Sequence, residues 1–314
     1  MKPITIVLFL MALLMSLPAS AQQEQKLLFE LSTDQRSYLL GEPIVITATV
    51  TNEGDAAVKV ISQFDPTFGF SRYKVTPPDG KAAEFVPPWI FSAIAAEQEV
   101  APGRSIHGAV DLYRGAKSST FDRPGRYEVV GVHNGVGESA PLTIMVNMPE
   151  KENVKEAARL MIDAQVTLFL RLEGAESLGG AVERLRQVQK LAPESKLGAY
   201  ADHALGVHLA TPGRDFSPNL QRPQEREQEQ VKLRGAKTRP ADLERAAKML
   251  DAPVRERLGF HFRTRSYTGM VKGYALAKNF EAAQRTFDAM VKEFGDKPQA
   301  ATEIKRARSY LNQR

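Results

Sequence analysis

Residues 38–55 read YLLGEPIVITATVTNEGD, and this stretch decides the fold of the N-terminal half of the chain. From Ile44 to Val50, aliphatic side chains at every second position alternate with valine and threonine. A period of two places the two sets on opposite faces of a β-strand. Gly-Glu-Pro at 41–43 precedes this run, and the turn formers Asn-Glu-Gly-Asp at 52–55 end it. The stretch therefore predicts a strand bounded by two turns.

Later segments repeat this combination of turn and alternation. AVKVIS at 57–62 is the expected partner of the first strand. A Pro-Gly turn precedes an alternating run both in APGRSIHGAVDLY at 101–113 and in RPGRYEVVGVHNG at 123–135, and APLTIMVNMP at 140–149 closes the region. Several short strands at turn-delimited spacing, with no helical period between them, predict an antiparallel β-sandwich over residues 27–148.

Two of these segments, 38–55 and 121–132, also carry a resemblance. Together they resemble the Ig-like modules of exported bacterial proteins, and similar patterns occur in proteinase-inhibitor-like, macroglobulin-type and adhesion domains. The resemblance covers residues 27–148 and implies an Ig-like sandwich. It also implies that Tyr127 packs and hydrogen-bonds at a strand corner, as an Ig-type tyrosine does.

The middle of this region contains FVPPWIF at 85–91, with the only tryptophan of the chain. Tandem prolines donate no ladder hydrogen bonds, so we expect a loop or an edge segment here. We expect its large side chains to be buried over the end of the sandwich or against the helical half. If exposed, they would form a rigid aromatic surface of the kind enriched at binding hot spots. The candidate partner-binding residues are Phe85, Trp89 and Phe91.

Residues 150–314 change to a helical period. Apolar residues spaced by three and four predict helices over 154–172, 179–192 and 199–213, and a helical pair over 266–298. The segment around 214–240 is polar, which predicts a solvated helix or a mobile loop. We therefore expect an all-α domain to follow the all-β domain.

The helical pair resembles a degenerate tetratricopeptide (TPR) repeat, with a second partial unit ending at Pro193. Val271 and Gly295 depart from the small residue and the proline that are usual in the repeat. The positions of matching character are Tyr267, Met270, Tyr274, Ala283 and Phe287. A generic helical bundle is the alternative. A TPR-like array presents a concave groove. The candidate groove residues are Tyr267, Lys272, Tyr274 and Arg285.

The ends and the composition indicate the compartment. Residues 1–21, MKPITIVLFLMALLMSLPASA, have the basic start, short apolar core and Ala-Ser-Ala site of a signal peptide. We therefore expect an exported chain, periplasmic or secreted, without membrane insertion after cleavage. The absence of cysteine excludes disulfides, thiolate nucleophiles and iron–sulfur clusters. Residues 22–149 hold 11 basic and 15 acidic side chains, whereas residues 150–314 hold 30 and 22. The net charge thus changes sign at the expected domain boundary.

The five histidines form no familiar catalytic or metal motif. His203 and His208 are five positions apart, which rotates them by about 140° around a helix, away from the shared face of an i,i+4 zinc pair. His107 and His133 would approach if their strands paired, but we expect both to be half-exposed surface residues. No phosphate loop, calcium loop or G-x-S-x-G motif is present. The sequence therefore predicts no catalytic residue, no cofactor and no metal.

These observations predict a non-enzymatic exported binding or adaptor protein that acts through protein–protein interaction, with no nucleic-acid partner. One alternative is a proteinase inhibitor that uses the proline-stiffened segment 85–91. Another is a carbohydrate-binding module in which Trp89 and its neighbours stack on sugars.

Overall fold

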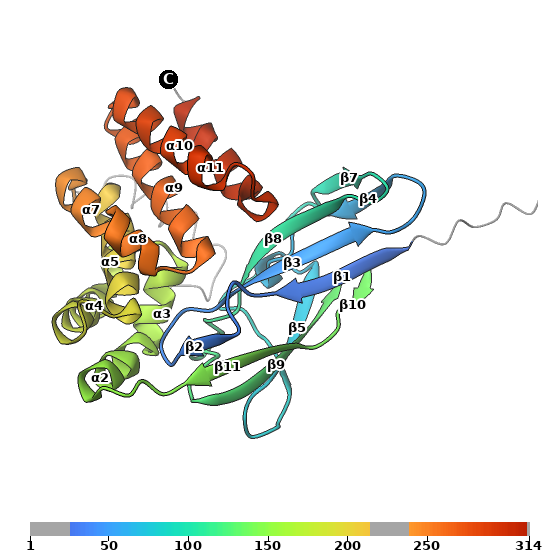
Figure 1. The fold of residues 1–314 in the computed structure, drawn as a ribbon, viewed down its shortest axis with the longest axis horizontal. Helices are drawn as coiled ribbons and strands as arrows, with labels where there is room; N and C mark the ends of the chain where they lie inside the picture. Colours follow the sequence, from blue (N-terminus) through green and yellow to red (C-terminus); the bar gives the residue numbers. More distant parts are fainter. Residues whose placement is uncertain (1–25, 214–238, 313–314) are drawn as a thin grey trace, which may run out of the picture.

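The computed structural model describes residues 26–213 and 239–312. All of its strands lie between residues 27 and 147, and its α-helices lie between residues 152 and 311. The prediction of a β domain followed by an α domain is confirmed. The helices gather at one end of the elongated sandwich (Figure 1). Residues 1–21, the expected signal peptide, and nearly all of the polar segment 214–240 lie outside the described residues.

The β domain is built from two main sheets and a short ribbon. Every pair of strands is antiparallel except β2 and β11, which run parallel. The first sheet has the order β1 (Leu27–Ser32), β3 (Val45–Asn52), β8 (Ser105–Asp111). The second has the order β2 (Ser37–Leu39), β11 (Leu142–Asn147), β9 (Gly125–His133), β5 (Ser71–Thr76), β6 (Ala83–Glu84), with β10 (Gly137–Glu138) beside β9. The ribbon pairs β4 (Val58–Ile61) with β7 (Glu97–Val100).

The predicted strand β3 is central to the first sheet. Its alternate residues from Ile44 to Val50 are buried, as the period of two predicts. Val45 and Thr47 on the opposite face are buried as well, because the helical domain covers that face. The expected pairing of β3 with AVKVIS is wrong. Both edges of β3 are occupied by β1 and β8, and residues 58–61 pair with β7 instead.

The α domain contains two runs of helices within the described residues, one before residue 213 and one after residue 239. The expected single helix over 154–172 is two helices, because the Asp163 carboxylate accepts hydrogen bonds from the backbone N–H groups of Gln165 and Val166 and starts a new helix there. The helices are α2 (Glu152–Met161), α3 (Ala164–Arg171), α4 (Gly179–Leu191), α5 (Lys196–Ala210), α7 (Leu243–Met249), α8 (Ala252–Arg257), α9 (Phe260–Leu276), α10 (Phe280–Phe294) and α11 (Ala301–Leu311). Single 3₁₀ turns are η1 (Pro66–Phe68), η2 (Glu176–Leu178) and η3 (Pro298–Ala300). Within residues 26–213 and 239–312, no helix is long and apolar enough to cross a membrane.

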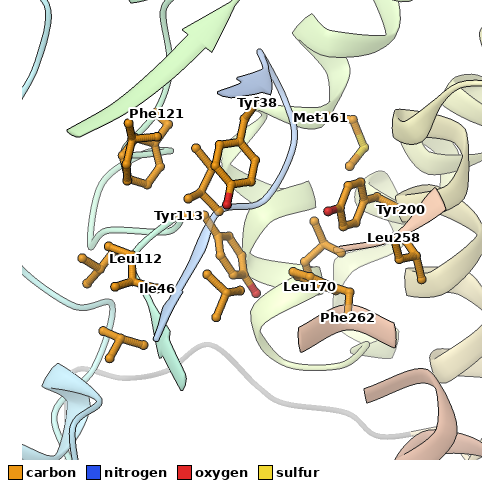
Figure 2. Packing of buried hydrophobic residues seen from close by; sticks show 14 of the residues in the cluster. Tyr38, Ile46, Leu112, Tyr113, Phe121, Met161, Leu170, Tyr200, Leu258 and Phe262 are labelled. Atoms are coloured by element: carbon orange, nitrogen blue, oxygen red, sulfur yellow. The ribbon is translucent and has the colours of Figure 1, made fainter. Parts of the chain in front are cut away.

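One hydrophobic core runs through both domains. It continues from the sandwich into α2, α3, α4, α5 and the start of α9, and Figure 2 shows Tyr113 of the β domain facing the side where Phe262 and Leu170 lie. The ring centroids of Tyr113 and Phe262 are 6.1 Å apart. Gly41, at φ 89°, lets the turn before β3 approach α2 closely, since a Cβ there would lie 3.0 Å from Ala158 O. The two domains are therefore joined by buried contacts rather than by a linker alone.

Candidate functional site

The segment predicted to recognise a partner crosses from β6 to β7 without strand structure. We call residues 85–96 the apolar segment. Backbone hydrogen bonds hold it at three points: the Phe85 N–H donates to Tyr73 O (2.7 Å), the Ala116 N–H donates to Val86 O (2.8 Å) and the Phe91 N–H donates to Thr67 O (2.7 Å). The loop expected from the tandem prolines is confirmed, and it is fixed to the sandwich.

The apolar segment is largely exposed, contrary to the expectation of burial. Phe85 is buried, but Phe91 is 51% exposed. Three further aliphatic residues, which the sequence analysis did not select, are more exposed still: Val86 at 59%, Ile90 at 68% and Ile94 at 93%. The prolines restrict the backbone at 87 and 88, and the hydrogen bonds fix it at 85, 86 and 91. The segment therefore presents a row of large apolar groups to solvent.

Trp89 occupies a different position within the segment. It is half-buried, and the guanidinium carbon of Arg171 lies 6.0 Å from the centroid of its ring. Arg171 belongs to α3, so Trp89 lies where the sandwich meets the helical domain, as expected for an interdomain contact. A cation over an indole face is attracted by the ring electrons.

A buried charge network joins the domains beside Trp89. Arg171 Nη2 donates to both carboxylate oxygens of Asp65, at 2.8 and 2.7 Å, and its Nη1 lies 2.6 Å from Asp111 Oδ2. Arg265 of α9 donates to the same Asp111 carboxylate at 2.9 and 3.0 Å. Burial lowers the pKa of Arg171, and Asp65 acts in the opposite direction. We call Arg171, Asp65, Asp111 and Arg265 the junction network. The sequence analysis missed it, because its members are scattered over the chain and no local motif marks them.

The predicted groove residues of the helical domain do not form one exposed surface. Tyr267 is buried; its hydroxyl donates to Glu293 Oε2 at 2.8 Å. Lys272 is also buried, with its Nζ 5.6 Å from the ring centroid of Tyr310 in α11. The expectation that these two side chains line an open groove is wrong, because both are buried inside the helical domain: Tyr310 of α11 lies beside Lys272, and Arg255 of α8 lies over the Tyr267 ring.

The other two predicted groove residues are more accessible. Tyr274 is half-buried between two apolar clusters, and Arg285 is exposed and paired with Glu281 one turn away.

One of the two strand histidines differs from expectation: His107 is half-buried, as expected, but His133 is not. His133 is buried between Phe29 and Phe64, with hydrogen bonds to Ser71 Oγ (2.7 Å) and Ile61 O (2.8 Å). It does not meet His107, because β8 and β9 belong to different sheets. Burial lowers the pKa of both histidines. His133 is thus a core residue rather than a half-exposed one.

The corner role that the resemblance implied for Tyr127 is confirmed. Its buried ring packs edge-on against Phe121, with centroids 5.1 Å apart, and its hydroxyl donates to Arg123 O at 3.0 Å.

Comparisons with known proteins give a faint likeness only. No protein-family model matches the sequence, and a search of curated proteins found no match. Among solved structures, the CARDB domain of a Pyrococcus furiosus protein in complex with di-metal ions is 12% identical, with 39% of this chain and 89% of that chain covered and a TM-score of 0.24. Pseudomonas fluorescens alkylpurine DNA glycosylase AlkC, bound to DNA containing an abasic site analogue, is 16% identical (39% and 31% covered, TM-score 0.27). β-Glucosidase 3B from Thermotoga neapolitana, in complex with glucose, is 17% identical (39% and 16% covered, TM-score 0.23). Similarities at this level do not identify an activity or a ligand for this chain.

Proposed function

We propose that this protein is a non-enzymatic exported binding protein that uses the apolar segment to hold a protein partner. The observation that carries the proposal is the row of exposed side chains at Val86, Ile90, Phe91 and Ile94 on a backbone fixed at three points. Contiguous exposed apolar groups on a folded protein mark interaction sites. A segment that is already ordered loses little conformational entropy when a partner binds.

The junction network supports an adaptor role. It holds α3 against the sandwich next to Trp89, so the apolar segment and the helical domain are presented as parts of one body. A partner that contacts the exposed segment can therefore also reach the neighbouring helices. A TPR-like use of the helical domain is part of this proposal, with Tyr274 and Arg285 as its accessible residues. Export rests on the signal-peptide pattern of residues 1–21.

Proteinase inhibition is the second candidate, because the same observation favours it. An exposed segment that contains Pro87 and Pro88 and is held by backbone hydrogen bonds is suited to occupy a protease cleft without reordering. Carbohydrate stacking on Trp89 has less support, since Arg171 already lies over the ring.

The test compares the chain from Gln22 with a variant that carries Ile90→Ser, Phe91→Ser and Ile94→Ser. Leu276→Ser is the matched control, because Leu276 is also an exposed apolar residue, at 50%, but lies at the end of α9. Cross-linking in periplasmic extract should capture a partner with the unmodified chain and the control but not with the triple variant. Equal capture by all three proteins contradicts the proposal. A panel of exported proteases, assayed with the same proteins, separates inhibition from adaptor binding.

A further inference from the structure

A second site lies at the domain junction, away from the apolar segment. It is a pocket of about 430 Å³ between the turn after β1, strand β3, the start of α9 and the end of α10. Its volume falls in the range of about 300–1,000 Å³ that is usual for small-molecule sites. Residues from both domains line it, so it exists only in the docked arrangement.

The apolar part of the pocket is a pair of phenylalanines. The rings of Phe260 and Phe294 meet edge to face, with centroids 5.4 Å apart and an interplanar angle of 86°. The guanidinium carbon of Arg263 lies 5.5 Å from the centroid of Phe294. The site can therefore hold an apolar group beside a positive charge.

The two carboxylates in the lining already have donors. Asp34 accepts the Tyr38 hydroxyl at 2.7 Å and the Phe260 N–H at 2.7 Å. Glu293 accepts the Tyr267 hydroxyl at 2.8 Å and is paired with Arg263. The Arg263 guanidinium neutralises Glu293, whereas Asp34 keeps its negative charge, which the positive end of the α9 helix dipole offsets in part because Asp34 accepts from the first N–H of that helix.

The imidazole in the lining is also satisfied. His261 Nε2 lies 2.8 Å from Thr47 Oγ1, a hydrogen bond that crosses the junction. Burial, together with the positive charge of Arg265, lowers the pKa of His261 to about 4. The ring is therefore neutral at pH 7 and adds no charge to the pocket.

The lining also contains donors with unused hydrogen-bonding capacity. Arg263 Nε is buried and has no hydrogen-bond partner among the described residues. Lys297 is 52% exposed and pairs with the exposed Asp296 beside it, a contact that leaves further N–H groups of the ammonium for a ligand. Gln299 adds a side-chain amide at the rim. A ligand that matches these groups carries acceptor oxygens and a negative charge.

We propose that the junction pocket binds a carboxylate attached to an apolar, preferably aromatic, body. The carboxylate lies against Arg263, Lys297 and Gln299, and the apolar body lies against Phe260 and Phe294. A free arylalkanoic acid and the C-terminal phenylalanine of a peptide share this chemistry. Charge-assisted hydrogen bonds to a carboxylate are about twice as strong as neutral ones, so the charge of the ligand should decide binding.

Calorimetry with the chain from Gln22 tests this, using 3-phenylpropionate and its neutral amide as probes. The acid should bind at least about tenfold more tightly than the amide, a difference of about 1.4 kcal/mol. The peptide Gly-Gly-Phe, with a free or an amidated C-terminus, distinguishes the sources. Tighter binding of the free peptide than of 3-phenylpropionate assigns the site to a peptide end, and the reverse order assigns it to a small acid.

Two substitutions of exposed residues locate the binding without threatening the fold. Lys297→Met removes a positive charge and Gln299→Glu adds a negative one; each should weaken the binding of the acid about fivefold or more. Lys292→Met is the matched control, because Lys292 is an exposed lysine of α10 outside the lining and should leave binding unchanged. Equal affinities for acid and amide, no binding of either, or loss of affinity only in the control overturns the proposal.

Discussion

Arg171 and Asp65 lie 106 positions apart in the chain and form an ion pair across the domain junction, in which Nη2 of the arginine donates to both carboxylate oxygens. Arg171 is 6% exposed and Asp65 is 15% exposed, so both charges are largely removed from water. Asp111 continues the pair by bridging Arg171 to Arg265. Such a network is costly to build but also costly to break, because the remaining partner is left as a buried charge. It therefore favours one fixed arrangement of the two domains.

Replacement of Arg171 by methionine should destabilise the protein strongly. The substitution leaves the Asp65 and Asp111 carboxylates buried with less positive charge beside them. We expect a loss of about 3–5 kcal/mol in the free energy of unfolding, the usual result of removing one partner of a buried pair. Urea denaturation followed by circular dichroism measures it.

Arg186→Met is the control for this experiment. Arg186 pairs with Glu183 on the surface of α4, with side-chain exposures of 46% and 66%. An exposed pair contributes less than about 1 kcal/mol. If Arg171→Met were as stable as this control, the junction network would not be what holds the domains together.

Glu173 should make the stability depend on pH in the acid range. Burial acts to raise the pKa of its carboxyl, but the Arg306 guanidinium, 2.8 Å from both oxygens, outweighs it and holds the pKa at about 2. A carboxyl with a lowered folded-state pKa stabilises the fold fully above its unfolded value of 4.5. That stabilisation is lost as the pH falls from about 4.5 to about 2.

Substitution of Glu173 by glutamine should therefore cost about 2 kcal/mol at pH 7 and almost nothing at pH 2. Denaturation curves of both proteins at intervals between these pH values show whether the difference narrows. Glu183→Gln on the exposed face of α4 is the control and should shift stability little at any pH. If the difference in the free energy of unfolding between the unmodified protein and Glu173→Gln is the same at every pH, titration of this carboxyl is not its cause.

Tyr127 offers a test of the sandwich corner. Tyr127→Phe keeps the ring that packs on Phe121 but removes the hydroxyl that donates to Arg123 O. Loss of this part-buried hydrogen bond should cost about 1 kcal/mol. Arg123→Ala keeps that carbonyl and removes only an exposed side chain, so its thermal midpoint should stay close to that of the unmodified protein.

The sequence predicted those features that depend on local pattern. The alternation in β3, the Pro-Gly entry to β9 and the corner position of Tyr127 are set by residues close to one another in the chain, and all three are observed. The pairing of residues 58–61 was predicted wrongly, because both edges of β3 are taken by β1 and β8, and β8 is distant in the sequence and has no local signal of this pairing.

Local sequence pattern could not predict which side chains are exposed or which residues distant in the sequence are in contact. Residues 85–91 were expected to be buried, yet backbone hydrogen bonds with Thr67 and Ala116 fix the segment in a position where Val86, Ile90 and Phe91 are exposed. Tyr267 has the spacing of a groove residue, but Arg255 of α8 and Phe294 of α10 lie against its ring, and the side chain is buried. The junction network and the pocket need both domains in place, so neither has a sequence signature.

Trp89 should report on whether the two domains unfold together. It is the only tryptophan of the chain and lies at the junction beside Arg171, so its emission follows the environment of that contact. Far-ultraviolet circular dichroism, by contrast, is dominated by the helices. Because one core and one charge network connect the domains, the urea transitions from the two signals should coincide.

The same measurement on Arg171→Met provides the comparison. With the network broken, the contact at Trp89 should open at a lower urea concentration than in the unmodified protein. If the shared core alone does not couple the domains, the fluorescence transition of Trp89 should then precede the loss of helix seen by circular dichroism. Arg186→Met should keep the two transitions together, since Arg186 lies on the exposed face of α4. Separate transitions already in the unmodified protein would show that the domains unfold independently, in spite of the core they share.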